Sequence, residues 1–329
     1  MSRLSNIVVN VASKMHGLAL GLKLKSSPPI ILLYHGVTQS MQQVGLSNCE
    51  GKHMPIELFI HHLRILRRSR CVIPLNQMVE GLASGAAMRN TVAITFDDGY
   101  ENNASVAAPV LADFNMSAAF FLTTGLIGTD SSIWTDRVEM ALDHTTRNSM
   151  HLPFSDDPIS ISNFNEKRHA LGLLKSMLKL LPAEKLHEAV TMLVDQLGVV
   201  ATPAKGNYRF MNWEQARELS AAGFEIGAHT ISHPILTKIP ISEATVEILG
   251  SRDKVLQEVG QCSKTFCFPN GKLTDFNAPL QALCREHFKA ALTSERGTAA
   301  MSDIFELKRL SPGGLKNGEN IEWMLLRGH

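Results

Sequence analysis

The sequence predicts an α/β fold with parallel strands, and three observations support this prediction. The chain has 329 residues, 44% of them hydrophobic, which is enough to bury the core of one large domain or two smaller ones. From Pro29 onward, short apolar runs alternate with stretches of helical periodicity, as in repeated βα units. No apolar run approaches the roughly twenty residues of a membrane-spanning helix. We therefore expect a soluble fold around a buried sheet.

The expected strands and helices follow in turn along the chain. The strands are short apolar runs that end at glycine, proline or polar residues: Ile30–Tyr34, Val92–Phe96, Ala118–Leu122, Phe224–Gly227, Thr265–Phe268 and Phe288–Leu292. The helices carry apolar residues on one face: 55–68, 104–114, 213–222 and 242–259. Pro55 opens the first of these helices and Gly223 closes the third, in keeping with the positions that proline and glycine favour.

Residues from about 130 to 208 interrupt this alternation. They contain a loop, 151–158, and a helical tract, 166–197, that Pro182 splits. Because the segment is longer than an ordinary crossover, we predict an insertion built on one βα connection. The predicted organisation is an N-terminal segment, residues 1–28, followed by one domain, residues 29–329, that carries the insertion.

The N-terminal segment is basic and amphipathic. No acidic residue precedes Glu50. The basic residues at the start of the chain are Arg3, Lys14, Lys23 and Lys25. Apolar residues recur at helical spacing, so residues 1–25 either associate peripherally with an anionic membrane or dock on the protein's own domain, and both alternatives stay open. Because no clear export signal is present, we expect a cytoplasmic protein, with the inner membrane surface as an alternative location.

Charge and cysteine content exclude other classes of protein. The net charge of +1 lacks the basic excess of a nucleic-acid-binding domain, so no nucleic-acid partner is expected. The cysteines are odd in number and include no Cys-x-x-Cys pair: Cys49, Cys71, Cys262, Cys267 and Cys284. We expect free, reduced thiols, which fit the cytosol.

Two adjacent carboxylates, Asp97 and Asp98, directly follow the apolar run Val92–Phe96, and Gly99 then turns the chain. Such a turn presents both side chains at the carboxyl end of the sheet, where α/β folds build their sites. Neighbouring acids repel each other and need a cation or a shared proton. An Asp-Asp-Gly turn taken alone is also typical of acids that face water, so the histidines decide between the two interpretations.

Two histidines, His229 and His233, follow the strand expected at Phe224–Gly227. Their spacing predicts that both rings lie on one side of a helical turn, suited to two metal bonds. One carboxylate and two imidazoles make a three-ligand site with an open position, as for catalytic zinc. The second carboxylate would be free to take a proton from a metal-activated water. We therefore expect a divalent cation, with Zn²⁺ as the first choice and Co²⁺ or Ni²⁺ as alternatives.

Thr95–Gly99 and His229–His233 resemble the first two motifs of the polysaccharide deacetylase family, the NodB-homology carbohydrate esterases, and Phe266–Gly271 is similar to the third motif. The resemblance covers about residues 29–311. It implies a distorted (β/α) barrel with the site at the carboxyl ends of the strands. It also implies that Asp97 is the general base, and that the two histidines bind the metal together with the second aspartate, Asp98.

The resemblance further implies where the substrate binds. The third-motif residues Pro269, Asn270 and Gly271 would line the acetyl pocket, with a backbone N–H near Asn270 directed at the oxyanion. Trp134, at the start of the insertion, and Tyr100, just after the two acids, are further predicted substrate contacts. A packing role for Trp134 is an equally good interpretation.

Two departures from the family pattern affect the predicted roles. Many members carry an arginine in the third motif that braces the base, whereas Cys267 stands here. Many also place the acid histidine in a late motif that this chain lacks. Leu33–Gly36 resembles the N-terminal strand motif of circularly permuted members that act on exopolysaccharides, which implies His35 as the general acid, partly protonated near neutral pH. The alternative is a half-buried structural histidine.

The expected function is metal-dependent hydrolysis of a carbon–nitrogen bond other than a peptide bond. The substrate would be an N-acetylated surface polysaccharide or its lipid-linked precursor, in exopolysaccharide biosynthesis. Removal of O-acetyl groups, deformylation of a lipid-linked amino-sugar, and glycan binding without turnover are the alternatives. A phosphatase of the haloacid-dehalogenase type would need Asp-x-Asp, whereas the two acids here are adjacent.

Overall fold

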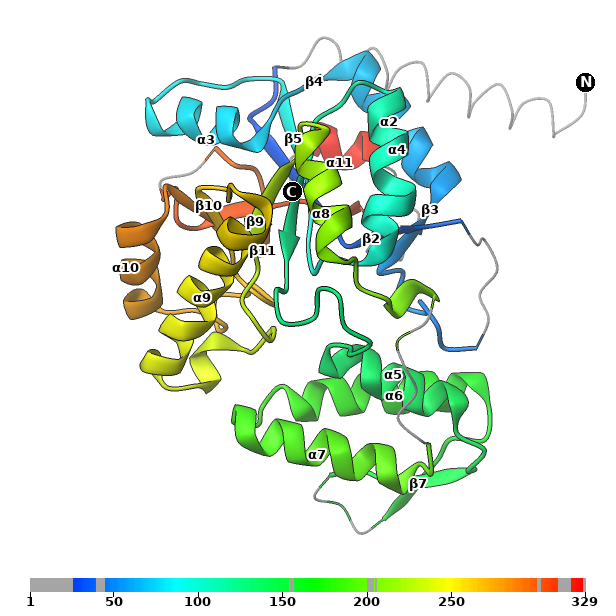
Figure 1. Ribbon diagram of the computed structural model, residues 1–329. Helices are drawn as coiled ribbons and strands as arrows, with labels where there is room; N and C mark the ends of the chain where they lie inside the picture. Colours follow the sequence, from blue (N-terminus) through cyan, green and yellow to red (C-terminus); the bar gives the residue numbers. More distant parts are fainter. Residues whose placement is uncertain are drawn as a thin grey trace, which may run out of the picture.

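The computed structural model describes residues 26–39, 45–153, 155, 157–199, 204, 206–300, 303–312 and 321–327. The predicted N-terminal helix over residues 1–25 lies outside these ranges, so its two alternatives stay open. Figure 1 shows strands at the centre and helices outside them, with α5, α6 and α7 grouped beyond the end of β5. Within the described residues, no helix is both long and apolar enough to cross a membrane.

The larger sheet has the strand order β1-β5-β6-β9, and the short β4 also pairs with β5. Its strands are β1 (Ile30–Tyr34), β4 (Cys71–Val72), β5 (Thr91–Phe96), β6 (Ala119–Leu122) and β9 (Glu225–Ala228). Every pairing is parallel, so all carboxyl ends lie at one edge. The predicted α/β fold with parallel strands is confirmed.

A second parallel sheet completes the barrel together with the larger sheet. It consists of β10 (Thr265–Cys267), β11 (Ala290–Arg296) and β12 (Leu307–Arg309). Leu310, directly after β12, exchanges two backbone hydrogen bonds of 2.9 Å with β1. At the other edge, Ser263, just before β10, donates from its backbone N–H to the carbonyl of Ile226 in β9 at 2.7 Å. The two sheets therefore meet at both edges and form an irregular, distorted barrel.

Successive residues of a strand point to opposite sides of the barrel wall. Apolar residues stand at both kinds of position, so both sides of the wall are apolar. The interior cluster draws on both sheets and includes Ile31, Ala93, Phe121, Cys267 and Leu292. Gly227 of β9 also belongs to this crowded wall, since a Cβ atom there would lie 2.6 Å from the Phe121 ring. Only glycine fits at that position.

Helices cover the outside of the larger sheet. They are α2 (Ile56–Ser69), α4 (Ala108–Asp113) and α8 (Trp213–Ala221), which pack on the outward strand residues. The helix expected over 104–114 begins instead as a π-helix, η1 (Asn103–Ala107), before α4. Pro109 has no N–H with which to continue regular α-helical bonding, and a π turn accommodates that gap.

The other elements described around the barrel are short strands and surface helices: β2 (Gly36–Thr38), β3 (His53–Pro55), α3 (Leu75–Ala83), η2 (Gly206–Tyr208), η3 (Leu236–Lys238), α9 (Ile241–Val259), α10 (Ala278–His287) and α11 (Ile321–Arg327). The long helix expected over 242–259 is confirmed by α9. All five cysteines are free, as the sequence predicts.

The segment after β6 forms a helical group with its own core. Its elements are α5 (Trp134–His144), β7 (Ser149–His151), β8 (Pro158–Ser160), α6 (Phe164–Leu178) and α7 (Ala183–Gln196). Residues such as Leu142, Leu174 and Val190 are fully buried between the three helices. The predicted split of the helical tract at Pro182 is confirmed, whereas the assignment of this segment as an insertion stays a prediction.

Buried His62 on α2 predicts a pH-dependent stability. Burial lowers the pKa of His62 from 6.5 to about 3, and its Nδ1 lies 3.2 Å from the Tyr34 hydroxyl. Below pH 6.5 the His62 imidazole takes up a proton in the unfolded chain, whereas in the folded chain it stays neutral down to about pH 3. The free energy of unfolding therefore falls as the pH drops from 6.5 toward 3. When the pH is lowered from 7 to 5, the free energy of unfolding of the wild type should fall by about 2 kcal/mol more than that of His62→Gln. Urea denaturation at the two pH values measures this difference. Equal losses would contradict this, and the exposed neighbour His61→Gln is the control.

Candidate active site

The carboxyl ends of the strands bring the predicted residues together. Tyr34 of β1 pairs with Phe96 of β5, so the residues that follow them, His35 and Asp97, lie at the same level. His229 follows the last residue of β9, and its backbone N–H donates to the carbonyl of Leu122 in β6 at 2.9 Å. The parallel register therefore aligns residues that are nearly 200 positions apart in the sequence.

Asp98, His229 and His233 form one compact group. The Asp98 Oδ1 atom lies 3.4 Å from Nε2 of His229 and 3.3 Å from Nε2 of His233. All three side chains are buried, and their candidate ligand atoms lie within 4.8 Å of one another. A carboxylate and two imidazoles at this spacing are the donor set of a catalytic divalent metal.

The two histidines do not lie on a helical turn, so that part of the prediction is wrong. Residues 229–233 form a loop in which Thr230 has a φ of 65° and His233 a φ of 61°. Pro234 follows at once and keeps His233 out of the helical conformation. Asp98 also has a left-handed φ, 74°. Such angles are uncommon outside glycine and concentrate at functional sites.

Glu247 of α9 holds this loop in place. Its Oε2 atom accepts hydrogen bonds from the backbone N–H groups of Ile231 and Ser232 at 2.7 and 2.9 Å. Its Oε1 atom accepts from the Ser232 hydroxyl at 2.6 Å. The carboxylate thus provides hydrogen-bond acceptors for the backbone N–H groups between the two histidines. These bonds fix the loop conformation, in place of the hydrogen bonds that a helix would form within itself.

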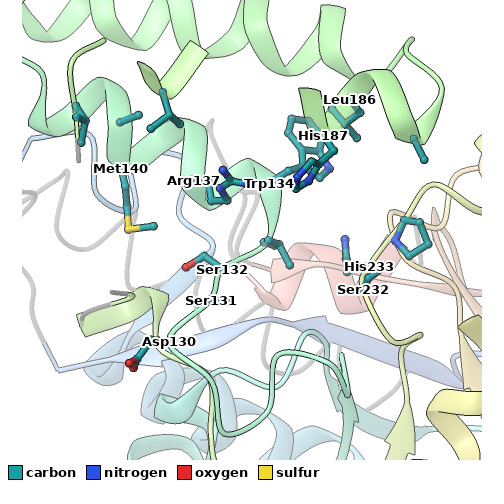
Figure 2. A pocket seen from close by; sticks show the side chains of 16 residues that line it. Asp130, Ser131, Ser132, Trp134, Arg137, Met140, Leu186, His187, Ser232 and His233 are labelled. Carbon is teal, nitrogen blue, oxygen red and sulfur yellow. The ribbon is translucent and has the colours of Figure 1, made fainter. Parts of the chain in front are cut away.

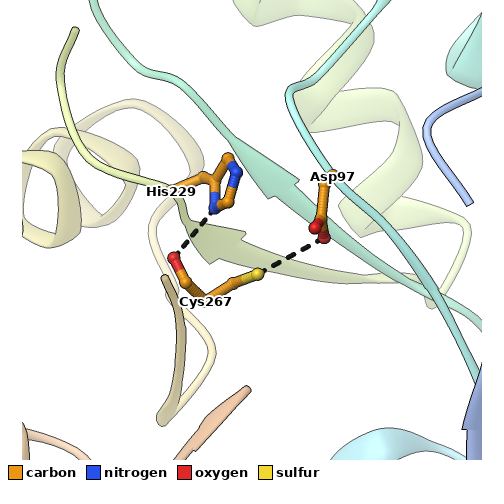
Figure 3. Close-up of side chains that lie close together, drawn as sticks. All are labelled: Asp97, His229 and Cys267. Carbon is orange, nitrogen blue, oxygen red and sulfur yellow. Dashed lines mark hydrogen bonds between the residues drawn. The ribbon is translucent and has the colours of Figure 1, made fainter. Parts of the chain in front are cut away.

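A second contact fixes the tautomer of His229. Its Nδ1 lies 2.8 Å from the backbone carbonyl of Cys267 at the end of β10 (Figure 3). A carbonyl oxygen only accepts, so Nδ1 carries a proton and Nε2 is the ring nitrogen that faces Asp98. Metal-binding histidines characteristically use their other ring nitrogen in this way.

Two observations indicate that a cation fits between these side chains. The buried Asp98 Oδ1, which faces both imidazoles, has no hydrogen-bond partner among the described residues. Burial alone would raise the pKa of Asp98, but His229 and His233 hold it well below its usual range, so the carboxylate is ionised. A buried, charged oxygen without a hydrogen bond is costly unless a cation completes its environment.

A different trio, Asp97, His229 and Cys267, also lies close together (Figure 3). It is a poorer metal site for two reasons. Burial raises the pKa of the Cys267 thiol, whereas metal binding requires the thiolate. In addition, Asp97 is already engaged by an arginine, as its contacts show.

Arg309, at the end of β12, forms a bidentate ion pair with Asp97. The Nη1–Oδ1 and Nη2–Oδ2 distances are both 2.7 Å, and the arginine side chain is fully buried. Burial would raise the pKa of Asp97, but Arg309 holds it below its usual value. Arg309 also donates to the Thr293 carbonyl at 2.7 Å and to the Cys267 sulfur at 3.3 Å. The base candidate is therefore ionised and fixed in orientation.

Arg309 thus braces the base candidate Asp97, which is the role that Cys267, at the arginine position of the third motif, cannot fill. The arginine that the family pattern places in that motif is supplied by another strand, and Cys267 adds weaker hydrogen bonds to the pair: its thiol donates to Asp97 at 3.4 Å and accepts from Arg309. The sequence contained one signal for this residue. An arginine inside the buried strand Leu307–Leu310 needs a buried acid as its partner.

His35 lies beside the two acids, as predicted, but its protonation differs from the expectation. Burial lowers the pKa of His35, the charges of Asp98 and Asp97 oppose this, and Lys52 and Arg309 lower it further. The net pKa is below its usual value of 6.5, so the neutral imidazole is the main form at pH 7. His35 is therefore partly protonated only at more acidic pH, and not near neutral pH as expected.

The remaining predicted contacts divide into two groups. Pro269, Asn270 and Gly271 follow β10 with only Phe268 between, and the buried Nδ2 of Asn270 has no hydrogen-bond partner among the described residues. Tyr100, by contrast, is fully buried, and its hydroxyl donates to Asp136 at 2.7 Å. The prediction of a direct sugar contact for Tyr100 is therefore wrong, because its ring offers no exposed surface.

Trp134 lines a pocket of about 690 Å³ between the helical group and the barrel. In Figure 2, Trp134, Arg137 and His187 lie on one side of the pocket, and Ser232 and His233 lie on the other. The pocket therefore reaches one of the candidate metal ligands. The indole N–H of Trp134 is buried and has no partner among the described residues.

Comparison with known proteins identifies the family. The sequence model described as polysaccharide deacetylase matches residues 84–284, more than half of the chain. The chain belongs to the polysaccharide deacetylase family. This deacetylase is accordingly a hydrolase, as predicted. Comparison with curated protein sequences finds no matching relative.

Solved structures resemble this deacetylase in fold. The deacetylase PplD of Streptococcus pyogenes, solved with acetate, is 16% identical with a TM-score of 0.59, over 93% of this chain and 100% of that one. IcaB from Ammonifex degensii is 15% identical with a TM-score of 0.56, over 88% and 93%. A Bacillus cereus polysaccharide deacetylase is 13% identical with a TM-score of 0.53, over 91% and 68%. The predicted NodB-type fold is confirmed.

The Arg309–Asp97 pair predicts a large effect of Arg309→Met. Removing the arginine leaves a buried carboxylate without its partner, so the unfolding free energy should fall by about 3–5 kcal/mol. The pKa of Asp97 should rise, which moves the acid limb of the pH–rate profile to higher pH. Urea denaturation and the profile of kcat/KM measure the two effects. Arg309→Lys keeps the charge and should show smaller changes, whereas wild-type behaviour of Arg309→Met would refute the bracing role.

Proposed function

We propose that this deacetylase is a metal-dependent hydrolase that removes N-acetyl groups from the sugars of a surface polysaccharide or its lipid-linked precursor. One observation carries the proposal. An ionised, arginine-braced carboxylate, Asp97, lies next to a buried group of one carboxylate and two imidazoles. Hydrolysis of an unactivated amide needs both a base for the water and an electrophile for the carbonyl, and this arrangement offers both.

Asp98, His229 and His233 are the residues that would hold the cation. When bound, a divalent metal supplies a Lewis acid for the acetyl carbonyl and lowers the pKa of the attacking water. Zn²⁺ is the proposed metal, and Co²⁺ and Ni²⁺ are the alternatives, because all three accept nitrogen and oxygen ligands.

The chain's own residues would transfer the protons. Asp97 accepts a proton from the water as its oxygen adds to the acetyl carbon, and Arg309 keeps the carboxylate ionised until then. When the carbon–nitrogen bond breaks, the leaving amine takes a proton, which His35 donates. The third-motif loop, Pro269–Gly271, contributes a backbone N–H to the oxyanion.

The sugar chain would lie in the pocket beside His233. Its lining combines the Trp134 ring with Arg137, His187 and Ser232. Aromatic surfaces and hydrogen-bonding side chains together are what a glycan requires. The proposal assigns the chain to the circularly permuted, exopolysaccharide-associated branch and to the cytoplasm or the inner membrane surface, both inferred from sequence.

Acetate release from a panel of substrates tests the proposal. N-acetylated oligosaccharides, O-acetylated oligosaccharides and lipid-linked acetylated or formylated amino-sugars would be incubated with the protein and Zn²⁺, Co²⁺ or Ni²⁺. We expect acetate and an equal amount of free amine from the N-acetylated substrates. Formate alone would favour the deformylase, and acetate without amine would favour the O-acetyl esterase. Glycan binding without any product would favour the non-catalytic alternative.

His35→Ala separates the acid from a structural role. Metal binding should be normal, and turnover of the N-acetylated glycan should fall by about 10²–10⁴-fold. The loss should be smaller on an activated acetyl ester, whose leaving group needs little protonation. For the wild type, activity should decline as the pH rises through the lowered pKa of His35, on the acid side of 6.5. Equal losses on both substrates would indicate a structural role, and unchanged amide turnover would place the acid elsewhere.

A further inference from the structure

The charged residues of helix α5 differ in whether the protein itself engages them. The acids Asp136 and Glu139 form ion pairs with Lys52 and Lys175. Arg137 lies between the two acids in the sequence and therefore on another face of the helix. Within the described part of the chain, no ion pair or hydrogen bond engages its side chain. The acids of α5 are thus used inside the protein, whereas the guanidinium is free to bind a ligand.

Arg137 lines the pocket of about 690 Å³ that also reaches the candidate metal site. Its side chain is partly exposed. In Figure 2, it lies on the opposite side of the pocket from His233. A glycan that enters this pocket and presents an acetyl group near His233 therefore extends past the guanidinium.

A second hydrogen-bond donor on the same wall also lacks a partner. Trp134 precedes Arg137 by three positions, so the two side chains share one face of α5. The indole N–H of Trp134 is buried and has no acceptor among the described residues. An indole N–H and a guanidinium can only donate hydrogen bonds. This wall of the pocket therefore suits a ligand that supplies acceptor oxygens.

The charges around the pocket indicate which acceptor group fits. Arg137 is the single lysine or arginine among the described residues that line it, and Asp130 is the single acid. In Figure 2, Asp130 lies at the other end of the pocket, away from the arginine. A guanidinium pairs with the two oxygens of a carboxylate in a bidentate way. A diphosphate carries more than one negative charge, for which this lining has no second permanent cation.

The remainder of the lining suits sugar rings. Trp134 provides an aromatic ring, and Leu186 and Val194 of α7 provide apolar surface. A glycan ring has both an apolar C–H face and polar edges, and pockets for such ligands combine apolar walls with a few polar groups. The cation and the apolar wall therefore fit one ligand, a sugar that bears a carboxylate.

We propose that Arg137 binds the carboxylate of an acidic sugar, so that the substrate is an acetylated polysaccharide that also contains uronic acid. This inference rests on the proposed deacetylation and names the substrate class for it. The acidic sugar is a neighbour of the acetylated sugar in the same chain, because one pocket contains both Arg137 and the candidate metal ligand His233. Arg137 contacts the substrate away from the bond that breaks.

The test compares one oligosaccharide in two forms. It alternates glucuronic acid with N-acetylglucosamine, and its carboxylates are either free or methyl-esterified. For the wild type, esterification should lower kcat/KM about 10- to 100-fold, the effect of losing a charge-assisted hydrogen bond. Arg137→Met should lose the same factor on the free acid and little more on the ester, because the interaction is already gone. Arg137→Lys keeps the charge and should retain part of the preference.

Controls separate binding from damage to the fold or the metal site. Arg168→Met removes an exposed arginine of α6 that does not line the pocket, and it should keep the wild-type kcat/KM. Arg137→Met should bind Zn²⁺ and hydrolyse 4-nitrophenyl acetate, which has no carboxylate, at the wild-type rate. Isothermal titration with the two oligosaccharides measures binding without turnover, and the wild type should bind the free acid more tightly by the same factor.

Each other outcome has its own meaning. Equal kcat/KM of the wild type on the free acid and the ester would overturn the inference, as would an equal loss by Arg137→Met on both. A preference for a lipid-linked N-acetylglucosamine diphosphate that disappears in Arg137→Met would assign the arginine to phosphate and overturn the carboxylate. If the wild type releases no acetate from any glycan, the proposed function fails. The titration then decides this inference, and equal affinities for the two oligosaccharides would refute it.

Discussion

Asp97→Asn is expected to retain metal binding and to lose about 10²–10⁴-fold in kcat, the range of general acid–base catalysis. The amide keeps the shape of the carboxylate but cannot accept the proton of water. Asp97 pairs with Arg309 and is not among the three residues assigned to the metal, so the cation should stay. Isothermal titration with Zn²⁺ and single-turnover acetate release measure the two properties.

Asp98→Asn is the matched variant, because it changes the neighbouring acid in the same way. Its oxygen lies among the histidines, so metal affinity should fall together with activity. Exchanged behaviour, with Asp97→Asn losing metal and Asp98→Asn keeping it, would mean that the two roles are reversed.

His229→Ala and His233→Ala are expected to abolish stoichiometric Zn²⁺ binding and all metal-dependent turnover. Each change removes one of three ligands, and a buried carboxylate with a single imidazole no longer completes the site. The metal content of purified variants, measured by elemental analysis, tests this directly. Full occupancy in either variant would exclude that histidine as a ligand.

Glu247→Gln provides a graded control for the histidine variants. Glu247 holds the backbone between the two histidines but donates nothing to the metal. Its replacement should weaken metal affinity by about 10- to 100-fold, as for other residues that orient ligands. A loss as complete as that of His229→Ala would mean that the loop conformation, and not ligand identity, dominates the site.

The parallel strands and the positions of the acids and histidines were predictable from local sequence. Apolar runs bounded by turn residues define strands, and the residues directly after parallel strands must meet at one edge. Asp97, His35 and His229 each follow such a run, so their proximity needed no knowledge of the loops.

Contacts between distant segments were not predictable in this way. Arg309 meets Asp97 across 212 positions, and Lys52 meets Asp136 across 84. No periodicity records such pairs, because they depend on how the barrel closes. The helical turn expected at His229–His233 failed for a similar reason, since Glu247, from α9, supplies the hydrogen bonds that stabilise a loop instead.

Acetate release by the metal-depleted protein, measured as Zn²⁺ is added back, tests the central claim most directly. With an N-acetylated oligosaccharide as substrate, we expect no acetate without metal and a linear rise to full activity at one Zn²⁺ per chain. Free amine should appear in equal amount, and His229→Ala should show no rise. Acetate release by the metal-depleted wild type at the full rate, or a saturated metal site without any product, would contradict the claim.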